Sequence, residues 1–406
     1  MGLASLGWLV GVSLGVSSPE DAGVVRTEVE KVLGGMAAAV LAGDPEAYLK
    51  HVDHADPVFS KEQFNWAADL KKHVPVEFRM TLGEAGVTLV DGSARGELSL
   101  VWRMPGPPHA EGEEAEPVRE RTVSWPARFV RGGSGWLYAG EVWHAHESPG
   151  VRVLHEDGLD QAAALVAELM PHVRDVVHEG FEVAPDDPLP HRTQEVKLYQ
   201  SMAHLQASIY LSYTDSLGGW NEPGEAIKLL ARPNTTRRSI ENRLAHEYGH
   251  VATFEMGPHA TDMPWWVLEG IANLAGEAAT NTGSPNTTVK RWAKAGTLGN
   301  WAEMAAFDEK GRSLGRYVYA QGHHMVAYVT ERFGRTRRNA WMRSMAQGAT
   351  LDESSREALG LSFADLDAQW REDLALELAR DEEAAAREPK TDPGSPVPGT
   401  PPPSPR

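Results

Sequence analysis

Two histidines one helical turn apart, with a glutamate after the first, are the residues best placed for metal chemistry. They form the H-E-x-x-H pattern His246-Glu247-Tyr248-Gly249-His250. Residues four apart on a helix project from one face about 6 Å apart, so both imidazoles can bind one zinc ion at about 2.0–2.1 Å. Glu247 would then lie beside the open coordination position, where it can exchange a proton with water that zinc has activated.

A helix must position these residues. The segment Ser239–Met256 carries apolar residues at helical spacing, including Ile240, Leu244 and Phe254, and Gly257-Pro258 marks its end. The pattern alone also fits an amphipathic helix with two surface histidines, so a third ligand decides between the two interpretations.

Glu269 is the candidate for that third ligand. It follows His250 by 19 residues, in the segment PWWVLEGIA at positions 264–272. The two segments together, H-E-x-x-H and then W-x-x-E-G-x-A, resemble the gluzincin superfamily of zinc metallopeptidases, in particular its peptidase-MA-like domains. The resemblance implies one zinc ion held by His246, His250 and Glu269, with Glu247 acting on water.

The resemblance extends from about residue 224 to residue 373. It includes Tyr317-Val318-Tyr319-Ala320-Gln321-Gly322, which resembles the Y-x-Q-G pattern of these domains. A tyrosine in this region of related gluzincins stabilises the oxyanion of the tetrahedral intermediate. The resemblance therefore implies that role for Tyr319, with Tyr317 as the alternative.

The position four residues after Glu269 departs from the gluzincin pattern. An acidic residue is common there, whereas this chain has Asn273. An amide oxygen can accept a hydrogen bond from a ligand histidine and orient the ring without adding charge. We therefore expect Asn273 to support a ligand histidine, the alternative being an ordinary amide.

The elements before the motif helix predict a small sheet. We expect a helix over about Asp160 to His178, strands within Val196–Leu211 and over Glu225–Leu230, and mainly helices after Arg237. In gluzincins, the strand before the active-site helix is commonly a sheet edge that pairs with an extended peptide. The resemblance implies that role for Glu225–Leu230.

Residues 20–148 predict a separate small domain. Apolar residues at helical spacing indicate a helix in 21–50 that is broken at Gly43-Asp44-Pro45, and alternating segments from Val76 to Trp143 indicate antiparallel strands. This layout resembles the nuclear-transport-factor-type fold. The predicted fold class is therefore α+β: this domain, a boundary near Pro149-Gly150, and a mainly helical gluzincin-type metallopeptidase domain over 150–387 with a small edge sheet.

The composition of the chain limits the kinds of binding partner and of chemistry that we expect. The formal net charge of −18 argues against nucleic acid, because phosphate binding requires clustered Lys and Arg. The chain has no cysteine, which excludes thiolate metal sites and cysteine nucleophiles. We expect a peptide or protein substrate and no transmembrane span beyond an N-terminal signal.

The two ends of the chain differ from the rest. Residues 1–18 include the uncharged apolar stretch Leu3 to Val16, which resembles the core of a secretory signal. We therefore expect export to the cell envelope or the extracellular space, with a cytoplasmic location as the alternative. The segment 388–406 is rich in Pro and Ser and predicts a disordered tail.

The residues together predict zinc-dependent hydrolysis of peptide bonds, with water activated by Glu247. Two alternatives stay open. One is a zinc-containing binding or scaffold protein with weak or no turnover. The other is a zinc hydrolase that acts on a non-peptide amide or an ester.

Overall fold

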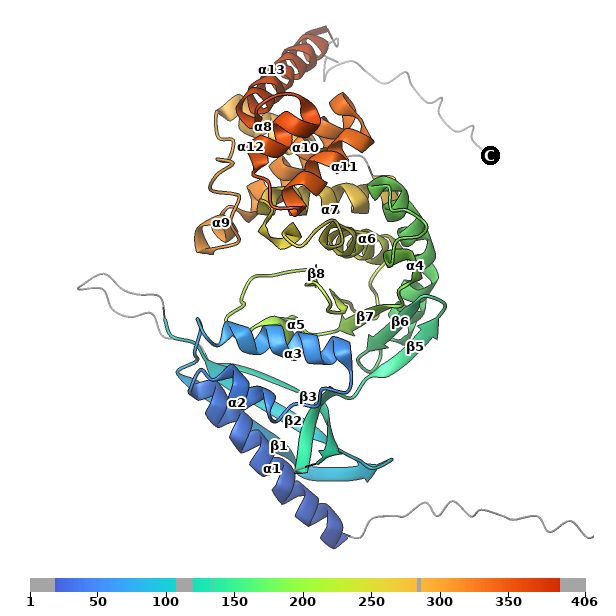
Figure 1. The fold of residues 1–406 in the computed structure, drawn as a ribbon, viewed down its shortest axis with the longest axis vertical. Helices are drawn as coiled ribbons and strands as arrows, with labels where there is room; N and C mark the ends of the chain where they lie inside the picture. The colour runs from blue at the N-terminus through green and yellow to red at the C-terminus, as the bar shows by residue number, and fades with distance from the viewer. Residues whose placement is uncertain (1–18, 107–119, 134, 283–285, 388–406) are drawn as a thin grey trace, which may run out of the picture. The chain divides into compact units, whose positions relative to one another are not determined.

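The structure is a computed structural model in which residues 19–106, 120–133, 135–282 and 286–387 are described (Figure 1). The chain forms two compact units. The first comprises Met1–Asp175 and Pro185–Val251, and the second comprises Val176–Ala184 and Ala252–Arg406. The predicted signal segment and the predicted tail lie outside the described residues. No described helix is long and apolar enough to cross a membrane.

The first unit begins with helices that pack on an antiparallel sheet. Its elements are α1 (Pro19–Leu41), α2 (Pro45–Leu49), α3 (Pro57–Asp69), β1 (Glu77–Val90), β2 (Ser93–Arg103), β3 (Arg121–Gly132) and β4 (Gly135–Glu141). The strands lie in chain order, β1-β2-β3-β4. Val29 and Met36 of α1 are fully buried in one core with Trp102 and Phe129 of the sheet.

The predicted helices and antiparallel strands of this region are confirmed. The break after α1 lies at Gly43, as predicted, where φ is +61°, and Asp44 caps α2. Two features differ from the prediction. The alternating segments Glu77–Leu82 and Gly86–Val90, which the sequence predicts as two strands, form one strand, β1, because a shift of register between Leu82 and Val87 lets the chain continue across a bulge. Helix α3 was not predicted; Asp56 caps it by accepting hydrogen bonds from the first turn.

A second sheet of the first unit has mixed strand directions. Its strands are β5 (His144–Ser148), β6 (Val151–His155), β7 (Gln194–Tyr199), β8 (Gly219–Trp220) and β9 (Ile227–Leu230), in the order β5-β6-β7-β9-β8. Strands β6, β7 and β9 are parallel, and the outer strands β5 and β8 are antiparallel to their neighbours. Helix α4 (Asp160–Phe181) confirms the helix predicted there, followed by η1 (Leu189–His191). The predicted boundary at Pro149-Gly150 lies in the β5–β6 turn.

Two predictions for this sheet were wrong. Strand β7 ends at Tyr199, and the rest of the segment predicted as strand forms helix α5 (Met202–Ile209), because Ser201 caps it by accepting a hydrogen bond from the His204 backbone N–H. The strand expected at the sheet edge, β9, lies between β7 and β8. The outer strand is β8, whose two residues are too few for sequence periodicity to reveal.

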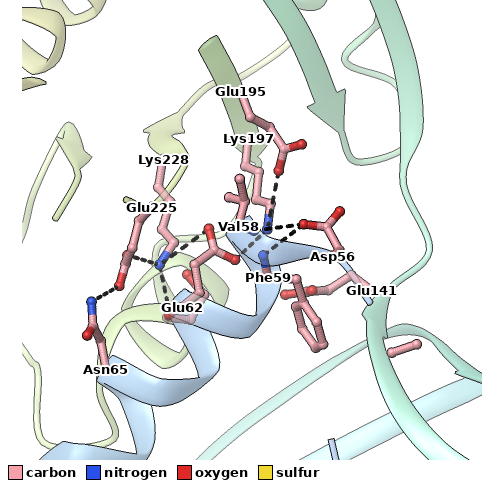
Figure 2. Close-up of polar contacts among 12 residues, drawn as sticks. Asp56, Val58, Phe59, Glu62, Asn65, Glu141, Glu195, Lys197, Glu225 and Lys228 are labelled. Atoms are coloured by element: carbon pink, nitrogen blue, oxygen red, sulfur yellow. Dashed lines mark hydrogen bonds and ion pairs between the residues drawn. The ribbon is translucent and has the colours of Figure 1, made fainter. Parts of the chain in front are cut away.

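Two lysines on adjacent strands of this sheet are buried (Figure 2). Lys197 of β7 and Lys228 of β9 are register partners. Lys197 pairs with Glu62 of α3, and Lys228 Nζ lies 2.9 Å from Glu225 Oε2. Burial alone would lower the pKa of Lys197, but the charge of Glu62 and neighbouring carboxylates raises it, so the ammonium stays charged. Removing Glu62 alone would leave a buried charge, at a cost of about 3–5 kcal/mol.

Every described regular element that lies wholly in the second unit is a helix, as predicted. These are η2 (Ala260–Asp262), α7 (Trp265–Thr280), α8 (Asn286–Ala295), α9 (Glu309–Ser313), α10 (Gly315–Phe333), α11 (Arg335–Ala346), α12 (Leu351–Ser354), the π-helix η3 (Ser355–Leu359) and α13 (Phe363–Arg387). Trp266 packs at 4.6 Å between ring centroids on Trp301, which contacts Trp370 at 5.4 Å. The segment Ser362-Phe363-Ala364-Asp365 has the pattern of a helix-capping box, and Ser362 Oγ does cap α13 by accepting a hydrogen bond from the Asp365 N–H.

Candidate metal centre

The H-E-x-x-H residues lie on α6 (Arg237–Phe254), close to the predicted helix limits. The rings of His246 and His250 project from one face, with centroids 4.9 Å apart and planes at 82°. His250 and Glu247 are both buried. The helix therefore brings two imidazoles and a carboxylate together as the spacing predicts.

Strand β8 runs along the same helix. A Cβ built on Gly219 would lie 2.5 Å from Glu247 Oε1, and one built on Gly218 would lie 3.2 Å from Arg243 Nε. Arg243 Nη1 also donates a hydrogen bond to the carbonyl oxygen of Leu230, at the end of β9. Successive turns of α6 thus contact Gly218, which precedes the outer strand, and Gly219, its first residue, where only a glycine leaves room for the Glu247 carboxylate.

Helix α7 positions Glu269. The indole Nε1 of Trp265, one turn earlier, donates a hydrogen bond to Glu269 Oε1 at 2.9 Å, and both side chains are buried. This bond fixes the orientation of the carboxylate. The sequence singled out Glu269 but not the role of Trp265, although the four-residue spacing between them is the signal that reveals it.

His246, His250 and Glu269 form a group that could hold a metal ion. Each offers one ligand atom, and these atoms all lie within 4.8 Å of one another. Two imidazole nitrogens and a carboxylate oxygen are a donor set that zinc prefers. The residues present therefore fit the ion that the sequence predicts.

Asn273 and Tyr319 contact each other in the second unit. The side-chain amide Nδ2 of Asn273 donates a hydrogen bond to the backbone oxygen of Tyr319 at 3.1 Å, so it ties α7 to α10. The predicted role of Asn273 beside a ligand histidine stays a prediction.

The two candidate tyrosines of α10 have different surroundings. The side chain of Tyr319 is 44% exposed, and its ring lies edge-on to Trp265, with centroids 6.1 Å apart. Tyr317 instead packs against Trp292, with ring centroids 4.4 Å apart and planes at 41°, and its hydroxyl accepts a hydrogen bond from Arg316. Tyr319 is thus linked through Trp265 to Glu269, which favours it over Tyr317 as the oxyanion donor.

Glycines of the two motifs on α7 and α10 allow these helices to approach closely. A Cβ on Gly270 would lie 2.6 Å from the backbone oxygen of Gly322, and a Cβ on Gly322 would lie 2.4 Å from that of Trp266. Gln321 is fully buried, and its side-chain amide accepts from the N–H of Gly299 and donates to its carbonyl oxygen. These residues set the position of the helices that carry Glu269 and Tyr319.

The two histidines of α10 have structural partners. His323 Nε2 lies 2.8 Å from Glu277 Oε2, and both residues belong to the second unit. His324 Nδ1 accepts a hydrogen bond from Trp370 Nε1, and burial lowers the pKa of His324 to about 4. His324 therefore stays neutral and serves as an acceptor in the core.

Comparison with known proteins supports the interpretation of this region. Residues 190–375 match the family model of the peptidase MA superfamily. The predicted resemblance to peptidase-MA-like domains is thereby confirmed for this segment. At this coarse level the chain carries a peptidase-like enzyme domain.

Comparisons with individual proteins add less. No curated protein matches the chain. One similar solved structure is a nuclear transport factor 2 (NTF2-like) superfamily protein from Salmonella enterica subsp. enterica serovar Typhimurium str. LT2. It has 11% sequence identity and a TM-score of 0.21, and the match covers 30% of this chain and 93% of that chain. A likeness of this degree carries no argument about the fold.

Proposed function

We propose that this chain is a zinc-dependent peptidase of the gluzincin type. The observation that carries the proposal is the grouping of His246, His250 and Glu269, whose ligand atoms lie within 4.8 Å of one another. The match of residues 190–375 to the peptidase MA superfamily supports it. We assign one zinc ion to these three residues and a peptide or protein as the substrate.

The mechanism assigns a distinct task to each side chain. Zinc, when bound, supplies the Lewis acidity that makes water a nucleophile near neutral pH. Glu247 accepts the proton that the attacking water gives up and then returns it to the leaving amine. Tyr319 donates a hydrogen bond to the oxyanion of the tetrahedral intermediate. Trp265 keeps the Glu269 carboxylate oriented through the bond to Oε1.

The outer strand β8 is our candidate for holding the substrate backbone. An extended peptide that adds to a sheet edge gains main-chain hydrogen bonds independent of its sequence. Strand β8 is the terminal strand of its sheet, and Gly219 in it contacts Glu247. A peptide on this edge would lie next to the proposed base.

The division into domains and the location of the protein are also part of the proposal. We assign residues 20–148 to an N-terminal domain, of nuclear-transport-factor type by its layout, and residues 150–387 to the metallopeptidase domain. We propose that the protein works outside the cytoplasm, on the basis of the signal-like residues 1–18.

The test is hydrolysis of a peptide library by the wild type and by Glu247→Gln, with zinc content measured on both. Glu241→Gln is the matched control, because Glu241 lies on the same helix but faces His172, at 3.8 Å. We expect cleavage by the wild type and the control, and a loss of about 10²–10⁴-fold in Glu247→Gln with zinc retained.

Other outcomes support the alternatives. Zinc without cleavage of any peptide, amide or ester would favour a binding or scaffold protein. Cleavage of esters or non-peptide amides without cleavage of peptides would favour a hydrolase of another class. Unchanged cleavage by Glu247→Gln would overturn the proposed role of Glu247.

A further inference from the structure

Two arginines lie directly opposite each other in the first sheet. Arg95 of β2 and Arg128 of β3 are register partners in the antiparallel ladder. Like charges at such a position destabilise a sheet. Other arginines of the same unit have acidic partners: Arg103 lies 2.8 Å from Glu77, and Arg152 lies 3.1 Å from Glu195. Among the described residues, neither Arg95 nor Arg128 has a carboxylate within ion-pair distance.

Some N–H groups of this arginine pair have a distant hydrogen-bond acceptor or none among the described residues. Arg95 Nε is buried and has no hydrogen-bond partner among the described residues. Arg128 Nη2 reaches the carbonyl oxygen of Ala139 at 3.4 Å, which is long for a hydrogen bond. A buried donor without a partner destabilises the folded state, and does so more when it is charged. We expect such an arginine pair where a bound anion supplies the missing acceptor and offsets the positive charge.

Both arginines line a cavity of about 190 Å³. A cavity of about 150 Å³ already holds a molecule the size of benzene. Phe59 and Trp143 supply an aromatic part of the wall, and Arg152 and Lys197 also line it but are paired with Glu195 and Glu62. The cavity is thus large enough for a small organic molecule and has both apolar and cationic surfaces.

The carboxylates in the wall are already engaged. Asp56 accepts hydrogen bonds from the N–H groups at the start of α3, and Asp53 accepts one from Ala55. Glu195 pairs with Arg152, and Glu141 lies 3.7 Å from His204. None of these four described carboxylates lies within ion-pair distance of Arg95 or Arg128, although all of them line the same cavity.

We propose that this cavity binds a small molecule that carries a carboxylate or phosphate group, with the oxyanion held between Arg95 and Arg128. Guanidinium groups present forked donors that match both oxyanions, and two of them can share one anion. The aromatic side chains Phe59 and Trp143 would contact the rest of the molecule. This site uses none of the residues assigned to zinc, so it goes beyond the proposed peptidase activity.

The test is isothermal titration calorimetry of the full-length protein with inorganic phosphate and with succinate, at constant ionic strength. Variants Arg95→Gln and Arg128→Gln are compared with Arg103→Gln, which changes an exposed arginine on β2, the strand that carries Arg95. We expect the wild type and Arg103→Gln to bind at least one of the two anions. The other two variants should bind it at least tenfold more weakly.

The thermal midpoint of each protein without anion provides the folding control. Removing one arginine of the pair relieves repulsion, so both pair variants should unfold at or above the wild-type temperature. Phosphate binding without succinate binding would identify a phosphate site, and the reverse a carboxylate site. The proposal is overturned if neither anion binds, or if the pair variants fold and bind as tightly as the wild type.

Discussion

The backbone of Gly219 lies directly against the carboxylate of Glu247. A Cβ at position 219 would approach Glu247 Oε1 to 2.5 Å and its Cγ and Cδ to 2.9 Å. Because real Cβ atoms do not come this close to other heavy atoms, any side chain at position 219 must displace Glu247 or the strand. Strand β8 therefore fixes the place of the proposed general base.

Gly219→Ala is expected to lower kcat/KM by roughly ten- to a hundred-fold, since overpacking costs about 1–3 kcal/mol and here displaces a reacting group. Zinc content should stay at the wild-type value. The control is Gly23→Ala, at an exposed position of α1 where a Cβ meets nothing within 4 Å. A wild-type rate in Gly219→Ala would show that Glu247 does not need this position.

Trp265→Phe should weaken zinc binding by roughly 10–100-fold, because the hydrogen bond that orients Glu269 is lost while the aromatic ring remains. Competition with a fluorescent chelator measures the affinity. Trp292→Phe is the matched control, because Trp292 packs on Tyr317. Equal affinities in the two variants would argue against an orienting role for Trp265.

Tyr319→Phe is expected to reduce kcat by about a hundred-fold with little change in KM, because only the hydrogen bond to the oxyanion is removed. Tyr317→Phe should keep most of the activity, since the Tyr317 ring packs on Trp292 and its hydroxyl accepts a hydrogen bond from Arg316. Steady-state kinetics on one peptide distinguish the two. The opposite result would assign the role to Tyr317.

His204 makes the stability of the first unit depend on pH. Burial would lower its pKa, but interactions with Glu141 and Glu156 raise it to about 9. Because the folded-state pKa lies above the unfolded value of about 6.5, the stabilisation is complete below about pH 6.5 and is lost as pH rises through about 9. The loss is expected to reach about 3 kcal/mol at most.

Urea unfolding at pH 6 and pH 9.5 measures this effect. His204→Gln removes the titrating group and should flatten the dependence, even if the variant is less stable at both values. An equally steep decline in the variant would mean that another group is responsible.

The sequence predicts the residues of the proposed metal site, but it does not predict the contacts that hold them in place. His246, Glu247 and His250 lie within one helical turn, so local spacing alone sets their arrangement, and the Glu269 segment adds a recognisable second half. The contact of Gly219 with Glu247 could not be predicted, because it depends on a strand of two residues. A chain segment of that length has no periodicity.

Contacts between residues that lie far apart in the sequence could not be predicted, for a related reason. The Arg95–Arg128 pair depends on the register of β2 against β3, and the pairing of Lys197 with Glu62 joins residues far apart in the sequence. Predicting α5 as part of a strand failed because Ser201 caps a new helix directly after β7. In each case, a tertiary contact or a single cap outweighs the apolar pattern of the segment.

Zinc content by elemental analysis of the purified wild-type chain, with His250→Ala and His259→Ala beside it, tests the central claim most directly. His259 is an exposed histidine paired with Asp262, so its loss should leave the metal site intact. We predict one zinc per chain in the wild type and in His259→Ala, and none in His250→Ala. A wild-type chain that holds no zinc after supplementation, or a His250→Ala variant that retains a full equivalent, would contradict the proposed metal centre.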